Sequence, residues 1–428
     1  MKILLDLTKK ELAGLMINLG EEKYRAEQLF TAMQNGKDYK DKINMPKTLL
    51  EKLQASDYLL QPIKIVKKLT SKDKNTKFLY ELHDGNLVEG MLMQYKFGNT
   101  LCVSTQVGCK MNCAFCASSL NGFVRNLSAG EILGQVTAVN ALLGGTISDR
   151  KITNIVLMGC GEPMDNFDNV TKFLQLVTND DGLNFSVRNI SISTCGIPKK
   201  MEELADLGYA VTLCISLHAP NDFIRQQIMP IAKRYSIHEV LEAGRYFHTI
   251  TNRRFIIEYT LIGGVNDSVN NAMELAELIK DYPCHVNLIR LNPVKERGLK
   301  APTPATCEKF LTTLYKCKIS ATLRRTIGED VDGACGQLRF NTMKETSSQE
   351  PSIKAKTVKK EERTKKPSEK TKTGRVAKDK KVANDKKLTK NDKNAKFGKS
   401  TKSSKNDNVR NTKKSKVEKP NRNRKSYR

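Results

Sequence analysis

The sequence lacks any stretch of 18 consecutive apolar residues, and this absence excludes an ordinary membrane-spanning helix. It also lacks a secretory signal at its start, because the short apolar run Ile3–Leu5 ends at Asp6. We therefore expect a cytoplasmic protein with no membrane partner. A chain of 428 residues has room for two or three domains and a large core.

The ligands of a zinc site and the pattern of a disulfide framework are missing as well. The five histidines include no HxxxH pair, and the chain has no second CxxC motif. Eleven cysteines is an odd number, and disulfide frameworks are unusual in a long chain without an export signal. We expect reduced thiols, which agrees with a cytoplasmic location.

Positive charge is unevenly distributed along the chain. Residues 351–428 contain 30 Lys+Arg and 8 Asp+Glu, so they carry +22 of the total net charge of +27. The same segment has few aliphatic and almost no aromatic side chains, so it cannot bury enough apolar surface to fold. We expect a disordered polybasic tail over 344–428 that contacts RNA phosphates; a solvated extension without an essential role is the alternative.

Three cysteines with the spacing CxxxCxxC form the most informative motif. Cys109, Cys113 and Cys116 supply three thiolates, which are the ligands of iron–sulfur clusters. Three protein ligands on a four-iron cluster leave one iron open, as in a reactive metal site. The same spacing fits one face of a helix with buried cysteines, but Gly108 and Asn112 disfavour that helix.

The first hundred residues contain two different patterns. Residues 1–60 have helical periodicity, with a capping box at Thr8 and Glu11, and we expect a small helical domain that docks RNA or packs on the core. Residues 61–98 alternate as strands around a hairpin turn at residues 83–86, which predicts a β extension.

Strand-like and helix-like segments alternate from about residue 99 to 343. This alternation predicts an α/β core with a parallel sheet, and the number of repeats suits a partial (β/α) barrel. In such folds the ligand lies at the carboxyl ends of the strands. The expected strands are Leu101–Thr105, Ile152–Met158, Val187–Ser193, Ala210–Leu217, Phe255–Leu261, Val286–Leu291 and Ile319–Arg324. The expected helices are Ala129–Leu143, Asp168–Thr178, Lys199–Leu207, Ile237–His248, Val269–Ile279 and Pro304–Tyr315.

The conspicuous motifs all follow expected strands. The cysteine loop follows the first strand and Gly161–Glu162 the second, so both are expected at one mouth of the barrel. A four-iron cluster with an open iron suits the reductive cleavage of S-adenosylmethionine, in which the protein binds and orients the reactant and excludes water. Gly161 lets the backbone approach this ligand closely, and Glu162 is placed to pair with its ammonium group.

Three further residues stand apart from the cluster motif. Cys102 lies inside an expected strand, and Cys335 lies in a glycine-flanked loop from which it could enter the barrel mouth as a nucleophile. Taken alone, each cysteine is more often a small buried residue. Glu89 lies among apolar neighbours, and the residues alone favour an outward-facing side chain. The other six cysteines are interpreted as structural: Cys160, Cys195, Cys214, Cys284, Cys307 and Cys317.

The segments LCVSTQVGCKMNCAFCASSLNGFVRNLSAGEI, GCGEPMDN, SISTCGIP, SLHAPND, LNPV and DVDGACGQL resemble, in order and spacing, the radical S-adenosylmethionine methyltransferases of the RlmN/Cfr family. The resemblance spans about residues 1–343. The CxxxCxxC motif alone indicates only the radical superfamily, whereas Cys102 together with Cys335 in GACGQL narrows the resemblance to this family.

The resemblance implies a mechanism of RNA adenine methylation that uses two molecules of S-adenosylmethionine per turnover. One methylates Cys335, and the other is cleaved at a 4Fe-4S cluster held by Cys109, Cys113 and Cys116. The methyl group on Cys335 becomes a radical and adds to carbon 2 of adenine. Glu89 then accepts a proton, which reverses the outward orientation favoured above, and Cys102 resolves the adduct by forming a disulfide with Cys335.

The resemblance also implies the cofactor contacts and partners. S-adenosylmethionine would be bound by a set of residues at the strand ends: Gly161, Glu162, Ser193, Ser216, Leu217, His218 and Asn292. The partners would be 23S rRNA, tRNA and an electron donor such as flavodoxin or ferredoxin, with a monomer as the expected state. Two alternatives stay open, a Cfr-like carbon-8 methyltransferase that confers antibiotic resistance and an iron–sulfur RNA-binding protein without catalysis.

Overall fold

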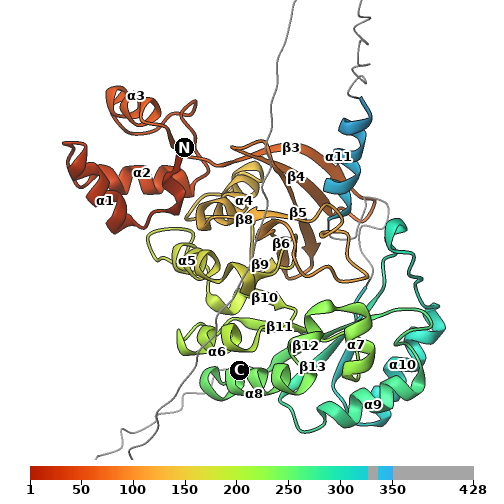
Figure 1. Ribbon diagram of the computed structural model, residues 1–428. Helices are drawn as coiled ribbons and strands as arrows, with labels where there is room; N and C mark the ends of the chain where they lie inside the picture. The colour runs from red at the N-terminus through yellow and green to blue at the C-terminus, as the bar shows by residue number, and fades with distance from the viewer. Residues whose placement is uncertain (326–335, 350–428) are drawn as a thin grey trace, which may run out of the picture. The chain divides into compact units, whose positions relative to one another are not determined.

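The computed structural model describes residues 1–325 and 336–349, within a compact unit formed by Met1–Lys354 (Figure 1). Within these residues, one sheet has the strand order β14-β13-β12-β11-β10-β9-β6-β5-β4-β3. The sheet is open, because β14 and β3 are its two edges. The division into domains at residues 60, 98 and 343 stays a prediction. No helix in the described part of the chain is long and apolar enough to cross a membrane.

The parallel part of the sheet is the partial barrel that the alternation predicts. Neighbouring strands follow one another in the sequence and all pair in parallel. Because helices cover parallel sheets of this kind, their strands consist mainly of buried apolar residues. The strands are β6 (Gly98–Cys102), β9 (Asn154–Leu157), β10 (Ile190–Thr194), β11 (Thr212–Ser216), β12 (Phe255–Leu261), β13 (Cys284–Arg290) and β14 (Ala321–Leu323).

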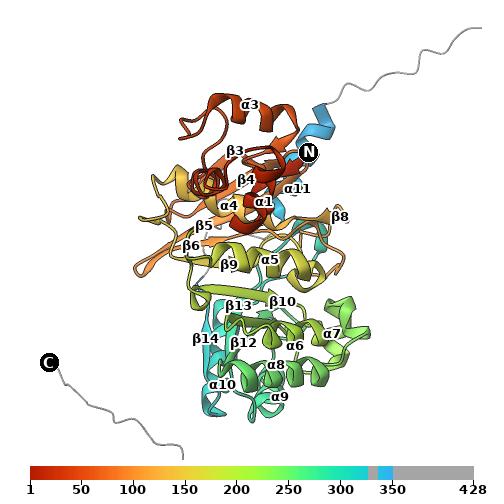
Figure 2. The ribbon, with the colours of Figure 1, turned by 90° about the vertical axis from the view of Figure 1, so that its left-hand side faces the viewer.

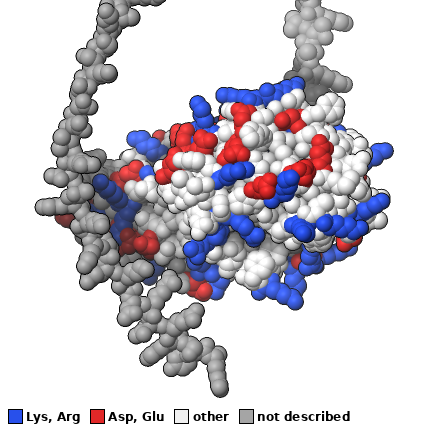
Figure 3. Space-filling view, turned by 90° about the horizontal axis from the view of Figure 1, so that it is seen from below, with Lys and Arg blue, Asp and Glu red and all other residues white. Residues whose placement is uncertain are grey.

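Amphipathic helices connect the parallel strands. Figure 2 shows several of them stacked along one side of the sheet. They are α4 (Ala129–Leu142), α5 (Phe167–Val177), α6 (Pro198–Asp206), α8 (Ile237–Thr251), α9 (Val269–Ile279) and α10 (Pro304–Lys316). The face of the molecule seen in Figure 3 carries basic and acidic side chains interspersed, not gathered into a patch of one sign.

The β extension does not form a separate sheet. Its three strands, β3 (Ile63–Thr70), β4 (Thr76–Leu82) and β5 (Leu87–Tyr95), are antiparallel, and β5 pairs with the first barrel strand, β6. The expected hairpin turn joins β4 to β5. This continuity brings one face of β5 beside the carboxyl end of β6.

The remaining elements are short or terminal. Two strands, β7 (Gln106–Gly108) and β8 (Phe123–Asn126), pair around the cysteine loop. Neither these strands nor α7 (Asp222–Ile228) was expected from the sequence. The helix α11 (Gln337–Gln349) continues past residue 344, where the tail was expected to start. Short 3-10 turns lie between other elements: η2 (Pro163–Asn166), η3 (Val187–Asn189), η4 (Pro230–Lys233) and η5 (Lys295–Arg297).

The first 60 residues contain helices, as expected. After β1 (Lys2–Ile3) and η1 (Leu4–Asp6) come α1 (Lys9–Asn18), α2 (Arg25–Gln34) and α3 (Lys47–Ala55), and β2 (Tyr58–Leu59) then pairs with β1. The capping box of Thr8 and Glu11 is confirmed, because each residue accepts a hydrogen bond from the backbone of the other.

Gly130 joins this helical region to the barrel. Its N–H donates to the Asp6 carboxylate over 2.5 Å, and a Cβ at Gly130 would lie only 2.7 Å from the backbone nitrogen of Asp6. Burial raises the pKa of Asp6, whereas the hydrogen bond from Gly130 lowers it. The first turn of α4 can therefore approach η1 only without a side chain at this position.

Replacing Gly130 tests this contact. Gly130→Ala should lower the free energy of unfolding by about 1–3 kcal/mol, because the methyl group meets backbone that must move. Gly14→Ala is the matched control, since Gly14 also lies in a helix and a methyl group there would have no atom within 4 Å. That control should be neutral or stabilising by up to about 1 kcal/mol. Equal urea-unfolding midpoints for the two variants would contradict the tight contact.

Candidate active site

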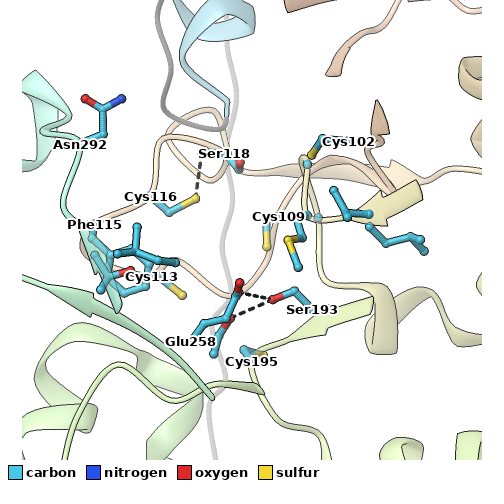
Figure 4. A pocket seen from close by; sticks show the side chains of 18 of the residues that line it. Cys102, Cys109, Cys113, Phe115, Cys116, Ser118, Ser193, Cys195, Glu258 and Asn292 are labelled. Atoms are coloured by element: carbon cyan, nitrogen blue, oxygen red, sulfur yellow. Dashed lines mark hydrogen bonds between the residues drawn. The ribbon is translucent and has the colours of Figure 1, made fainter. Parts of the chain in front are cut away.

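A cavity of about 350 Å³ lies at the carboxyl ends of the parallel strands. Its volume is in the range of small-molecule sites. Figure 4 shows the sulfur atoms of the three motif cysteines around one open space, with Cys102 to one side. The predicted residues that line the cavity are Glu89, Cys102, Cys109, Cys113, Cys116, Gly161, Glu162, Ser193, Ser216, His218 and Asn292.

The cysteine loop is held closed by the pairing of β7 with β8. Gly108 ends β7 with φ +77°, and the N–H of Cys109 donates to the carbonyl of Gly122 over 3.3 Å. A Cβ at Gly108 would lie 1.9 Å from that carbonyl oxygen, which no rearrangement of a side chain could relieve. The fold of the loop therefore depends on glycine immediately before the first cysteine.

Arg297 in η5 braces the same loop through hydrogen bonds. Its guanidinium donates to the carbonyl of Cys116 over 3.0 Å, to the amide oxygen of Asn112 over 3.0 Å and to the hydroxyl of Ser119 over 2.8 Å. One planar side chain thus fixes three points of the loop. The loop is a positioned structure and not a helical turn with three core cysteines.

Burial raises the pKa of two of the loop thiols, those of Cys109 and Cys113. It raises the pKa of Cys109 to about 12, and the nearby thiol of Cys116 contributes to this rise. The pKa of Cys113 is also raised, first by burial and then by Cys116 and Cys109. Thiolates are the metal-binding form, so a bound cation has to displace these protons.

The Gly161–Glu162 segment is fixed by the neighbouring strand end. Gly161 has φ +110°, and a Cβ there would lie 2.6 Å from the side chain of Gln106. The Glu162 carboxylate accepts from the N–H of Met164 over 3.0 Å and from the N–H of Cys195 over 2.8 Å. Burial raises its pKa, and these hydrogen bonds act in the opposite direction.

Ser193 and Ser216 meet a carboxylate that the sequence analysis did not single out. The hydroxyl of Ser193 donates to Glu258 over 2.8 Å (Figure 4). It also lies 3.2 Å from the hydroxyl of Ser216. Ser216 and Glu258 are register partners in β11 and β12. Glu258 is only 6% exposed and lines the cavity, so this side holds an acidic and hydroxyl-bearing surface.

His218 and Leu217 differ in what they present to the cavity. His218 has the left-handed φ of +56°, and its Nδ1 accepts from the N–H of Thr260 over 2.9 Å, so the ring proton is on Nε2. Burial and then Arg225 lower the pKa of His218 to about 3, which keeps the imidazole neutral. The side chain of Leu217 is in the main apolar core and does not line the cavity.

Glu89 and Cys102 come from the adjoining strands β5 and β6. Cys102 is 8% exposed and packs with Met91 and Met93. Glu89 is 3% exposed, so the outward orientation that the residues alone favoured is wrong. The reason is that β5 continues the barrel sheet and turns this face toward the cavity.

The Glu89 carboxylate has three donors within reach. It lies 3.1 Å from the ammonium of Lys77 and accepts from the N–H of Gly336 over 2.5 Å and from the N–H of Arg339 over 3.0 Å. Cys335 lies outside the described residues, but its neighbour Gly336 is described and is packed against Ser118, where a Cβ would lie 2.4 Å from the backbone nitrogen.

Several known proteins are similar to this chain in sequence. The Radical SAM superfamily model matches residues 103–276. A probable dual-specificity RNA methyltransferase RlmN from Clostridium botulinum (strain Okra / Type B1) is 48% identical over 342 residues, which is 79% of this chain and 98% of the relative. Its counterpart from Lachnospira eligens is 45% identical and covers 79% of this chain and 96% of the relative. The chain belongs to the RlmN family of radical SAM RNA methyltransferases.

A solved structure agrees with this assignment. The radical SAM methyltransferase from Sphaerobacter thermophilus is 39% identical, has a TM-score of 0.75 and covers 79% of this chain and 99% of its own. Membership of the RlmN family implies a 4Fe-4S cluster, S-adenosylmethionine and an RNA substrate. The donor set fits such a cluster, because three thiols line one cavity.

Sequence reasoning missed three charged residues of the site: Arg225, Glu258 and Arg297. Glu258 had a signal, a single carboxylate inside the apolar strand FIIEYTL. Arg225 is fully buried and donates to the carbonyls of Leu217 and Cys195. Arginines in polar segments usually face solvent, so neither Arg225 nor Arg297 could be selected without the structure.

Replacing Gly108 tests whether closure of the cysteine loop depends on glycine at this position. Gly108→Ala should prevent the loop from closing and reduce iron and sulfide incorporation at least about five-fold, because the added Cβ collides with backbone. Iron and sulfide analysis after anaerobic reconstitution, together with visible absorbance, measures this loss.

Gly122→Ala is the matched control for backbone strain. Gly122 also has a positive φ, of +68°, but no atom lies within 4 Å of a Cβ at that position. This variant should lose only about 1–2 kcal/mol of stability and retain its cluster. Normal cluster content in Gly108→Ala would contradict the proposed closure.

Proposed function

We propose that this chain methylates carbon 2 of adenine in 23S rRNA and in tRNA through a methyl-cysteine intermediate. The observation that carries the proposal is that Glu89 and Cys102 line the same cavity as the three motif cysteines. A site that only held a cluster or only bound RNA would have no use for a buried carboxylate and a further thiol at this place.

The cofactor-binding roles follow from the strand ends. Cys109, Cys113 and Cys116 would hold the 4Fe-4S cluster, which would supply the electron for the reductive cleavage of S-adenosylmethionine. Glu162 would pair with the ammonium group of S-adenosylmethionine. The hydroxyls of Ser193 and Ser216 would contact other parts of S-adenosylmethionine. Gly161, the backbone of Leu217, His218 and Asn292 complete the proposed contacts.

The roles in methyl transfer fall to residues outside the barrel loops. Cys335 carries the methyl group, and Glu89 accepts the proton lost from the adenine adduct. Cys102 then attacks the sulfur of Cys335, so that a disulfide forms while the bond between that sulfur and the transferred carbon breaks and the product is released. The hydrogen bond from the N–H of Gly336 to Glu89 supports these roles, because Gly336 directly follows Cys335 in the sequence and is held at the carboxylate of the proposed proton acceptor.

The chemistry of the substrate explains why a carrier is useful. Carbon 2 of adenine is electron-poor, so a direct polar methyl transfer to it is unfavourable, whereas radical addition is feasible. One S-adenosylmethionine loads the carrier and a second generates the radical, which gives two per turnover. An electron donor such as flavodoxin or ferredoxin supplies the electrons, both for the cleavage of S-adenosylmethionine and for reducing the Cys102–Cys335 disulfide before the next turnover. We propose that the protein acts as a cytoplasmic monomer.

The product identifies the reaction. Reconstituted protein is incubated anaerobically with a reductant, methyl-deuterated S-adenosylmethionine and unmodified 23S RNA or tRNA, and the nucleosides are analysed by mass spectrometry. We expect deuterium-labelled 2-methyladenosine. 8-Methyladenosine would assign the chain to carbon-8 methylation, and the absence of any methylated base with an intact cluster would leave only RNA binding.

Replacing the proposed carrier tests the intermediate. Cys335→Ala should reduce RNA methylation at least about 10³-fold while leaving cluster absorbance and reductive cleavage of S-adenosylmethionine in place, since nothing else presents the methyl group. Cys317→Ala is the matched control, because Cys317 is an exposed cysteine. Full methylation by Cys335→Ala would exclude the methyl-cysteine route.

A further inference from the structure

A line of side chains leads out of the cavity along β5. Successive side chains of a strand alternate between its faces, so Glu89, Met91, Met93 and Tyr95 share one face. The first three line the cavity. Tyr95 is 37% exposed, and its hydroxyl donates to the sulfur of Met93 over 3.6 Å. The line therefore runs from the buried carboxylate to the surface without a break.

An exposed aromatic pair ends this line. Tyr95 pairs with Gly98 in the register of β5 and β6, so Lys96 and Phe97 form the two-residue loop of a hairpin. The rings of Tyr95 and Phe97 are stacked, with centroids 4.8 Å apart and planes inclined by 7°. Phe97 is nevertheless 72% exposed.

The hairpin itself does not explain this phenylalanine. Two-residue hairpin loops favour small or polar residues such as Asn-Gly, Asp-Gly or Gly-Gly. The positive φ of this turn, +127°, lies at Gly98 and not at Phe97. Phe97 is thus an exposed ring whose orientation is fixed by stacking on Tyr95, and such a ring is suited to bind a planar partner.

The surrounding charges select the chemistry of that partner. Lys96 is exposed between the two rings in the sequence, and Arg324 and Arg325 line the cavity. The guanidinium of Arg324 lies 3.7 Å from the sulfur of Met93, the neighbour of Tyr95 in this line. Aromatic faces flanked by cations suit single-stranded nucleic acid, in which bases stack on rings while phosphates contact Lys or Arg.

We propose that the Tyr95–Phe97 pair is a stacking platform for an unpaired nucleotide of the RNA next to the target adenine. The adenine itself enters the cavity over Met91 and Met93. An enzyme that acts on a base must take it out of its stack, and the platform replaces the stacking that the neighbouring base loses. This inference rests on the proposed function, because it assumes an RNA substrate.

The test compares variants of Phe97 in the full-length holoprotein. Affinity for an unmodified RNA stem-loop is measured at several salt concentrations, together with kcat/KM for its methylation. Phe97→Ala should weaken binding about ten-fold, which corresponds to about 1.4 kcal/mol. The slope of log affinity against log salt should not change, because stacking releases no counterions, whereas Lys96→Gln should reduce that slope by about one.

Two further variants separate stacking from apolar contact. Phe97→Trp should restore the affinity, and Phe97→Leu should not, because leucine is apolar but has no ring face. Phe223→Ala is the matched control, since Phe223 in α7 is 75% exposed and does not line the cavity. It should bind and methylate RNA as the wild type does.

Three results would overturn the platform. Wild-type affinity and kcat/KM in Phe97→Ala, while the wild type makes methyladenosine, would exclude the platform alone. Full recovery by Phe97→Leu would show an apolar contact without stacking. A wild-type dimer that Phe97→Ala converts to a monomer, in analytical ultracentrifugation, would identify a second copy as the occupant. If the wild type neither binds nor methylates RNA, the proposed function and the platform fail together.

Discussion

Two opposite charges hold the residue at the end of β10 and thereby the mouth of the barrel. Parallel strands that end at one edge leave backbone groups unpaired there, and buried groups of this kind must find partners. The N–H of Cys195 donates to the Glu162 carboxylate over 2.8 Å, and its carbonyl accepts from the Arg225 guanidinium over 2.6 Å. Arg225 also binds the carbonyls of Ser216 and Leu217. Cys195 therefore links the Gly161–Glu162 segment, through Glu162, to the Ser216–Leu217 segment, through Arg225.

The barrel could be predicted because each of its elements has a local signal. The strand Phe255–Leu261 and the helix Val269–Ile279 were expected with the bounds that the structure has. Other bounds moved where local chemistry intervened. Residues Val187–Asn189 were expected in a strand, but Ser186 caps them and they form η3. The pairing of β5 with β6 had no turn signal, because the two-residue loop Lys96–Phe97 lacks the Asn-Gly or Asp-Gly type of sequence that marks a hairpin.

The candidate site was predicted to the extent that its residues carry motifs. The three cysteines and Gly161–Glu162 have fixed spacings, and the structure brings them to one cavity. A single carboxylate in an apolar strand has a weaker signal, since alternation says that it faces one side but not which side is covered. That is why Glu89 was misjudged from its neighbours and Glu258 was passed over, although both are buried. Arg225 and Arg297 each donate hydrogen bonds to several acceptors at once, and these acceptors come together only in the folded chain.

The distribution of charge limits what general electrostatic attraction can contribute to RNA recognition. Most of the net positive charge lies after residue 350, and a charged segment of this kind attracts any RNA in a salt-dependent manner. The carboxylates inside the cavity face donors of the protein, such as Lys77 at Glu89 and Ser193 at Glu258. General attraction cannot select which nucleotide enters. Selection of a nucleotide therefore needs contacts with the bases themselves, and the exposed, stacked rings of Tyr95 and Phe97 are our proposed site for such contacts.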